Sequence, residues 1–134
     1  MRPEPGREGR RWLAQAENDL AFATLASRER FFAQACFNAQ QAAEKALKAF
    51  LYARGAEQVL GHSVADLIVE CARLDGVFAG LQGRVAALDQ FYVATRYPNS
   101  LPGGIPADAF GQADASRALA MAGEVLDAVK GALG

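Results

Sequence analysis

Residues 35–68 constrain the fold more than any other part of this 134-residue chain. The stretch begins with alanines interrupted by polar residues, which is typical of an α-helix because alanine loses no side-chain entropy there. Gly55 belongs to the residue type that most often ends a helix. His62 and Ser63 then precede a new apolar pattern, and Ser63 with Asp66 has the spacing of a capping box in which Asp replaces Glu. The stretch therefore predicts two consecutive helices joined by a short connection.

Apolar residues recur at helical spacing through the rest of the chain. The predicted helices cover about residues 10–26, 31–54, 63–74, 78–95 and 112–132. Residues 1–9 hold two prolines and two glycines and are expected to be a flexible lead-in to a single domain, 10–134. Residues 98–111 hold three prolines and three glycines and are expected to form a loop. No segment alternates as a strand does, so we expect an all-α antiparallel bundle of four to five helices.

Composition excludes several classes of protein. Apolar residues make up 51% of the chain, which excludes a disordered protein, and a net charge of −1 provides no global basic field for nucleic acid. No signal-peptide core and no membrane span is recognisable, so we expect a cytoplasmic protein without membrane association. Cys36 and Cys71 match no metal or redox motif and are expected to be buried, reduced thiols, with no metal and no cofactor bound.

The helix predicted over 31–54 presents a line of polar side chains. About 100° of rotation per residue places the following five within roughly 40° of one line: Gln34, Asn38, Gln41, Lys45 and Lys48. A solvated face is the simplest interpretation. Amides, however, both donate and accept hydrogen bonds, and lysines attract anions. We therefore predict Lys45 and Lys48 as anion-binding residues, and the three amides as a partner or dimer face. Glu44 has the spacing of an exposed ion pair with Lys48.

Two further segments are candidates for binding an anion. His62, the only histidine, and Ser63 lie at a predicted helix N-terminus, where free N–H groups favour a phosphate. The alternative is a structural role for His62 in closing the loop. Arg96 is followed by Tyr97 and by a turn fixed at Pro98. Arg96 either complements the helix dipole or, together with Tyr97, binds a phosphate and stacks a base.

Several short motifs occur in a characteristic order. They are W-L-x-x-A-x-x-D-L at residues 12–20, A-x-x-A-A-E-K-A-L-K at 39–48, G-H-S at 61–63 and R-Y-P at 96–98. In this order and spacing the chain resembles the HEPN family over about residues 11–129. The resemblance implies a compact bundle of four to five helices that is often a homodimer. Prokaryotic members are frequently encoded beside a small nucleotidyltransferase.

Many HEPN proteins are metal-independent ribonucleases that use an arginine followed, after four to six residues, by a histidine. Here the three positions that follow Arg96 at that distance are Leu101, Pro102 and Gly103. The resemblance therefore implies a non-catalytic module linked to a nucleotide or RNA, the accessory partner of a small nucleotidyltransferase in a toxin–antitoxin-like pair. The alternatives are a purely structural homodimeric interaction protein and, disfavoured by the missing histidine, a ribonuclease toxin.

Overall fold

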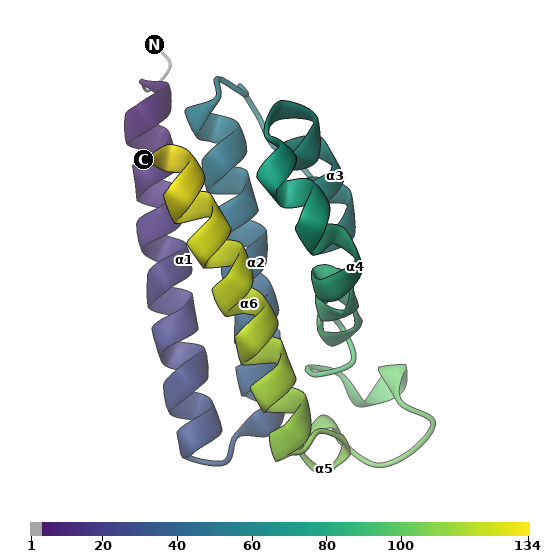
Figure 1. Ribbon diagram of the computed structural model, residues 1–134. Coiled ribbons are helices and arrows are strands. Elements are labelled where there is room, and N and C mark those ends of the chain that lie inside the picture. Colours follow the sequence, from purple (N-terminus) through teal and green to yellow (C-terminus); the bar gives the residue numbers. More distant parts are fainter. Residues whose placement is uncertain (1–3) are drawn as a thin grey trace.

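The computed structural model describes residues 4–134, and within this range every regular element is a helix (Figure 1). The α-helices are α1 (Pro5–Arg28), α2 (Phe32–Ala53), α3 (Val64–Leu74), α4 (Gln82–Val85), α5 (Pro106–Ala109) and α6 (Gln112–Leu133). Three 3₁₀ turns complete them, η1 (Gly76–Leu81), η2 (Ala86–Phe91) and η3 (Pro98–Ser100). The predicted all-α bundle is confirmed. No helix in this range combines the length and apolar character that crossing a bilayer requires.

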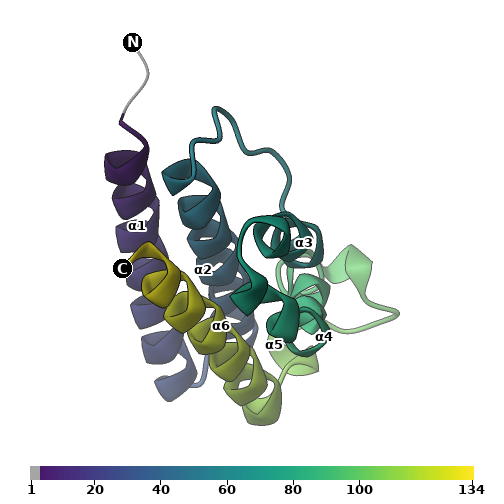
Figure 2. The same ribbon diagram turned by 45° about the horizontal axis from the view of Figure 1, so that its top comes forward.

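Helix α2 is the centre of the bundle. It packs against α1, α6 and α3, and both views show it between α1 and α3 with α6 lying across it (Figures 1 and 2). Its fully buried residues include the alanines at positions 35, 39, 42, 43, 46 and 49. Small side chains let the neighbouring helices approach closely. Phe50 fills the core, and its ring centroid lies 4.7 Å from that of Phe78.

The N-terminal end of α1 differs from the prediction. The helix begins at Pro5, so residues 5–9 are not a flexible lead-in, whereas residues 1–3 lie outside the described range. Proline suits the first helical position because its missing N–H is unpaired there in any case. Gly9 is buried where α1 meets α2; a Cβ atom at Gly9 would lie 2.7 Å from Ala53 Cβ and 2.9 Å from Ala49 O. This glycine provides close helix packing, and not flexibility.

The single helix predicted over 78–95 is also wrong. The segment consists of η1, α4 and η2 followed by turns. Gly76, Gly80 and Gly83 weaken its helix propensity, and tighter 3₁₀ turns bring residues three apart onto one face. Five apolar side chains consequently point into the core: Phe78, Leu81, Val85, Leu88 and Phe91. The other predicted helices agree with the structure to within two residues at each end, except α1.

Helices α1 and α2 end in the same type of turn, a Schellman motif. After α1 the residue in the left-handed conformation is Arg30 (φ 69°), and after α2 it is Gly55 (φ 99°). Both backbone hydrogen bonds of each motif form, at 2.8 to 3.0 Å. Glycine adopts this conformation without strain. For a residue with a Cβ atom the same conformation is less favourable by about 1–2 kcal/mol, because the Cβ atom comes too close to the backbone carbonyl oxygen. The α1–α2 turn is therefore strained and the α2–α3 turn is not.

Cys36 and Cys71 are free and buried, as predicted. Burial raises the pKa of each thiol to about 12, because the low-polarity core disfavours the thiolate. Neither cysteine is therefore suited to nucleophilic chemistry at neutral pH.

Candidate functional site

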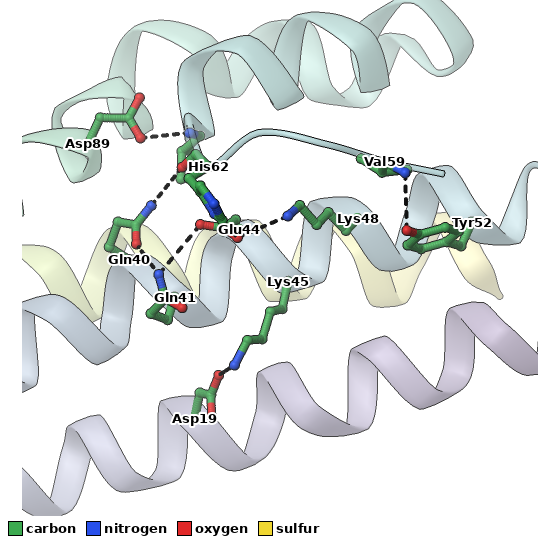
Figure 3. A network of polar contacts seen from close by, with 11 residues as sticks. Asp19, Gln40, Gln41, Glu44, Lys45, Lys48, Tyr52, Val59, His62 and Asp89 are labelled. Atoms are coloured by element: carbon green, nitrogen blue, oxygen red, sulfur yellow. Dashed lines mark hydrogen bonds and ion pairs between the residues drawn. The ribbon is translucent and has the colours of Figure 1, made fainter. Parts of the chain in front are cut away.

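The polar line on α2 becomes, in its C-terminal half, part of a buried network. The Glu44–Lys48 pair that the spacing predicts does form, but it is buried and not exposed: Glu44 is 3% exposed and Lys48 is 6% exposed. Oε2 of Glu44 accepts a hydrogen bond from Lys48 Nζ at 3.1 Å and lies 3.1 Å from Nδ1 of His62 (Figure 3). A carboxylate can only accept, so Nδ1 is the donor in this contact. The α2–α3 connection, through His62, packs against Glu44. Helical spacing within α2 cannot predict that another segment will bury the Glu44–Lys48 pair.

Two glutamines extend this network toward the α2–α3 connection. Nε2 of Gln40, which is fully buried, donates to the backbone oxygen of His62 at 3.0 Å. Nε2 of Gln41 donates to Gln40 Oε1 at 2.9 Å and lies 3.5 Å from Glu44 Oε1. Gln41 was predicted for a partner face, yet its amide nitrogen is engaged within the chain. Gln40 was missed, because its neighbours in sequence give no sign that the connection packs over it.

The other two amides of the predicted partner face lie nearer the start of α2. The side-chain nitrogen of Asn38 donates to the backbone oxygen of Gln34 at 2.9 Å, so this amide is turned back along the helix. The side chain of Gln34 is exposed. Of the three predicted residues, Gln34 presents the most open surface.

Both predicted anion-binding lysines are paired with acidic residues. Nζ of Lys45 lies 2.6 Å from Oδ2 of Asp19, which joins α2 to α1 (Figure 3). Lys48 is paired with Glu44, and its Nζ also lies 5.8 Å from the centroid of the Trp12 ring. An incoming anion would have to compete with these carboxylates. The charge of each lysine is thus compensated inside the protein.

The N-terminus of α3 already holds a carboxylate. Asp89 accepts hydrogen bonds from the backbone N–H groups of Val64 (2.6 Å) and Ala65 (3.0 Å). It also accepts one from Ser63 Oγ at 3.0 Å, while Ser63 Oγ accepts the N–H of Asp66 at 3.1 Å. The capping role of Ser63 is confirmed. Asp89 accepts from the donors that a phosphate would need here, so the phosphate position predicted at this helix end stays a prediction that requires Asp89 to be displaced.

Arg96 differs from the lysines, since no carboxylate of the described residues compensates its charge. Its guanidinium carbon lies 4.3, 4.9 and 5.1 Å from the ring centroids of Phe37, Tyr92 and Tyr97, respectively. Nε donates to the backbone oxygen of Tyr92 at 3.0 Å. The side chain is exposed and, within residues 4–134, no carboxylate forms an ion pair with it. The terminal nitrogens of a pre-oriented guanidinium are therefore available to an anion.

Tyr92 brings Arg96 and His62 together. The ring of His62 stacks on that of Tyr92 with centroids 5.1 Å apart and planes at 17°. The imidazole side chain is 58% exposed while its Nδ1 faces Glu44, so Nε2 is the ring nitrogen left for other contacts. Sequence reasoning missed Tyr92 and Phe37. The only local signal for Tyr92 is its position four residues before Arg96, and Phe37 has none.

The structure places the predicted residues in two groups. Arg96, Tyr97 and His62 lie around Tyr92. Lys45 is instead paired with Asp19 of α1, and Lys48 is paired with Glu44, which contacts His62 of the α2–α3 connection. Among the described residues, no three His, Cys, Asp or Glu side chains are grouped so as to hold a metal ion. We call Phe37, His62, Tyr92, Arg96 and Tyr97 the arginine–aromatic cluster. It is the candidate site.

Comparison with known proteins agrees with this architecture. The chain is similar to TT1696 from Thermus thermophilus, a crystal structure with 37% sequence identity and a TM-score of 0.87, covering 92% of this chain and 97% of that one. It is also similar to ST0689, described as an archaeal HEPN homologue, with 31% identity, a TM-score of 0.71 and coverage of 95% and 98%. No curated protein matches. The HEPN domain model matches residues 10–132, and the chain therefore belongs to the HEPN domain family.

Proposed function

We propose that this HEPN chain is a non-catalytic module that binds a nucleotide unit at the arginine–aromatic cluster, with Arg96 on the phosphate and Tyr97 against the base. The observation that supports this most strongly is the position of Arg96 among three aromatic rings, with Nε already bonded to the chain. The guanidinium is thus held in place before a ligand arrives, which reduces the entropy lost on binding. Tyr97 is 50% exposed and can offer a ring face to a base.

The charges around the cluster favour a ligand with one phosphate at this position. Lys45 and Lys48 are compensated by Asp19 and Glu44, which leaves Arg96 as the cation of the site. A triphosphate would bring three or more negative charges to a single guanidinium. The charge of one guanidinium is better matched by a nucleoside monophosphate or by one phosphodiester of single-stranded RNA. Binding measurements with both ligands show which of them the site prefers.

Substitution of Arg96 tests the proposal directly. We expect Arg96→Ala to weaken binding of adenosine monophosphate and of a short single-stranded RNA about tenfold or more, as loss of a charge-assisted contact does. Arg96→Lys keeps the charge but not the planar fork and should recover only part of the affinity. Arg84→Ala is the matched control, since Arg84 is an exposed arginine paired with Glu124 outside the cluster. Unchanged affinity in Arg96→Ala would overturn the proposal.

The partner is proposed from the family resemblance. We propose that a small nucleotidyltransferase binds this chain, in a toxin–antitoxin-like pair, so that the nucleotide site serves the shared reaction. Co-purification of the tagged chain from its native host, followed by mass spectrometry, tests this. Recovery of a nucleotidyltransferase supports the pairing, and its absence from a preparation that retains nucleotide binding removes the pairing while leaving the ligand site intact.

A ribonuclease is the second candidate, and one observation favours it. His62 and Arg96 are far apart in sequence, yet both contact Tyr92, and Glu44 orients the imidazole. Nε2 could then take the proton of a 2′-hydroxyl group that attacks the adjacent phosphorus and return it to the 5′-oxygen as the P–O5′ bond breaks, which yields a 2′,3′-cyclic phosphate while Arg96 holds the phosphate. Incubation of RNA with purified wild-type protein and with His62→Gln tests this. Cleavage by both proteins would identify a contaminant, and cleavage by neither would remove the candidate.

A further inference from the structure

Three helices meet at the end of the molecule where α1 begins and α6 ends, and a hollow lies between them. Figures 1 and 2 show the last turns of α6 beside the first turns of α1 and the end of α2. The hollow has a volume of about 510 Å³, a size typical of small-molecule sites. Its lining includes three cationic side chains, Arg10 of α1, Arg54 directly after α2 and Lys130 of α6. We call it the bundle-end hollow.

Two of these three cations have no acidic partner among residues 4–134. No carboxylate in this range forms an ion pair with Arg10 or Arg54, and no Asp or Glu side chain lines the bundle-end hollow. Lys130 is paired only loosely, since its Nζ lies 3.7 Å from Oε1 of Glu17 and both side chains are 48% exposed. The bundle-end hollow therefore carries an excess of positive charge.

The helix dipoles explain only part of this arrangement. Arg54 and Lys130 lie at the C-terminal ends of α2 and α6, where a cation is favourable. Arg10 lies in the second turn of α1, near the helix end that favours anions instead. Repulsion among the three cations opposes folding, and local costs of this kind are typical of functional sites. A bound anion would remove the repulsion.

The surroundings of the cations strengthen their attraction for an anion. Leu13 and Leu133 provide apolar walls, and charges beside apolar walls interact more strongly than charges in open water. Arg54 is also held in place: its guanidinium carbon lies 5.5 Å from the Phe50 ring centroid, and Nη1 donates to the backbone oxygen of Leu74 at 3.4 Å. The other guanidinium N–H groups remain able to donate to an anion.

We propose that the bundle-end hollow binds a small oligophosphate, in which phosphate groups are joined by anhydride bonds. Arg10 and Arg54 donate to its oxygens, and Lys130 leaves Glu17 to join them. Guanidinium groups match phosphate oxygens in geometry, and each phosphate group brings at least one negative charge to the three cations. The bundle-end hollow shares no residue with the arginine–aromatic cluster, so this proposal does not depend on nucleotide binding there.

Isothermal titration calorimetry with pyrophosphate, at constant ionic strength and without divalent cations, tests the proposal. We expect one site per chain and a dissociation constant at least about tenfold higher in Arg10→Ala and in Arg54→Ala. Both arginines are exposed, so the circular dichroism spectrum should not change. Arg11→Ala is the matched control, because Arg11 is an exposed neighbour of Arg10 that is paired with Glu8. A wild-type protein that does not bind pyrophosphate, or an equal loss of affinity in Arg11→Ala, overturns the proposal.

Arg96→Ala separates the bundle-end hollow from the proposed nucleotide site. This variant should bind pyrophosphate as tightly as the wild type does. Loss of pyrophosphate binding in Arg96→Ala but not in Arg10→Ala would place the anion at the arginine–aromatic cluster and would contradict the bundle-end site.

Glu4→Gln should have the opposite effect to the arginine variants. Gly6 lines the bundle-end hollow, and a Cβ atom at Gly6 would lie 3.1 Å from Glu4 Oε1 and 3.4 Å from Arg10 Nη1. Removal of this nearby negative charge should lower the dissociation constant for pyrophosphate. An unchanged or higher value would show that the ligand is bound away from Arg10.

Orthophosphate tests the class of ligand. A single phosphate group reaches fewer of the three cations, so we expect orthophosphate to bind at least about tenfold more weakly than pyrophosphate. Equal affinities would contradict an oligophosphate site.

Discussion

Nδ1 of His62 lies 3.1 Å from Oε2 of Glu44, a carboxylate that is 3% exposed and that also accepts a hydrogen bond from Lys48. Glu44 thus links α2 to His62. His62 in turn stacks on Tyr92, and Tyr92 contacts Arg96. The buried ion pair and the exposed candidate site are physically connected.

Removal of the Glu44 charge should destabilise the fold. Glu44→Gln leaves the ammonium group of Lys48, whose side chain is 7% exposed, without an anionic partner, and a change of this kind costs about 3–5 kcal/mol. The double variant Glu44→Gln/Lys48→Met removes both charges and should recover part of that loss. Urea unfolding of the single and double variants measures the difference. Equal stability of Glu44→Gln and wild type would contradict a buried pair.

Gly9→Ala should destabilise the α1–α2 contact. The new Cβ atom would lie 2.7 Å from Ala53 Cβ and 2.9 Å from Ala49 O, and backbone at that distance cannot move aside easily. Overpacking of this kind costs about 1–3 kcal/mol. Gly123→Ala is the matched control, since Gly123 lies inside α6 and its Cβ would meet nothing within 4 Å. Thermal unfolding should show a lower Tm for the first variant and an equal or higher Tm for the second.

Arg30→Gly should stabilise the monomer by about 1 kcal/mol, because Arg30 occupies the left-handed conformation in which glycine avoids strain. Gly55→Ala, at the equivalent position after α2, should destabilise it by a similar amount. Denaturant titration of both variants at a concentration that keeps the protein monomeric isolates the turn from any effect on association. Shifts of the same sign in the two variants would refute this account.

The cysteines should be unreactive until the protein unfolds. Burial raises the pKa of Cys36 and Cys71 to about 12, so the thiolate is scarce in the folded state at pH 8. The stability contributed by these protonated thiols is complete below their ordinary pKa of 9.0 and is lost as the pH rises toward about 12. A disulfide-exchange reagent should therefore modify two thiols in denaturant and none rapidly without it. Fast modification of the native protein would count against their burial.

Local signals predicted the parts of the fold that depend on neighbouring residues. Alanine content, Gly55 and Ser63 place the end of α2 and the start of α3 correctly, because helix stops and caps act within a few residues. Gly9 was misjudged as flexible, since its role emerges only once Ala49 and Ala53 are beside it. The tight turns of η1 and η2 likewise depend on the core that they fill.

The candidate site was predicted in part for the same reason. The turn at Pro98 pointed to Arg96 and Tyr97, but Phe37 and Tyr92 join them only through tertiary packing. The lysines were predicted to be available because helical spacing says nothing about Asp19, which lies on another helix. Asp89 fills the α3 N-terminus across 25 residues of sequence separation from Val64, and no local pattern indicates this contact.

The most direct test of the account is the salt dependence of RNA binding. If Arg96 alone neutralises a phosphate, the logarithm of the association constant for a short single-stranded RNA should fall with the logarithm of salt concentration with a slope of about −0.7. Arg96→Ala should abolish that dependence together with most of the affinity. A slope about three times steeper, or one that persists in Arg96→Ala, would show that other cations bind the phosphates and would contradict the assignment of Arg96 as the single cation of the site.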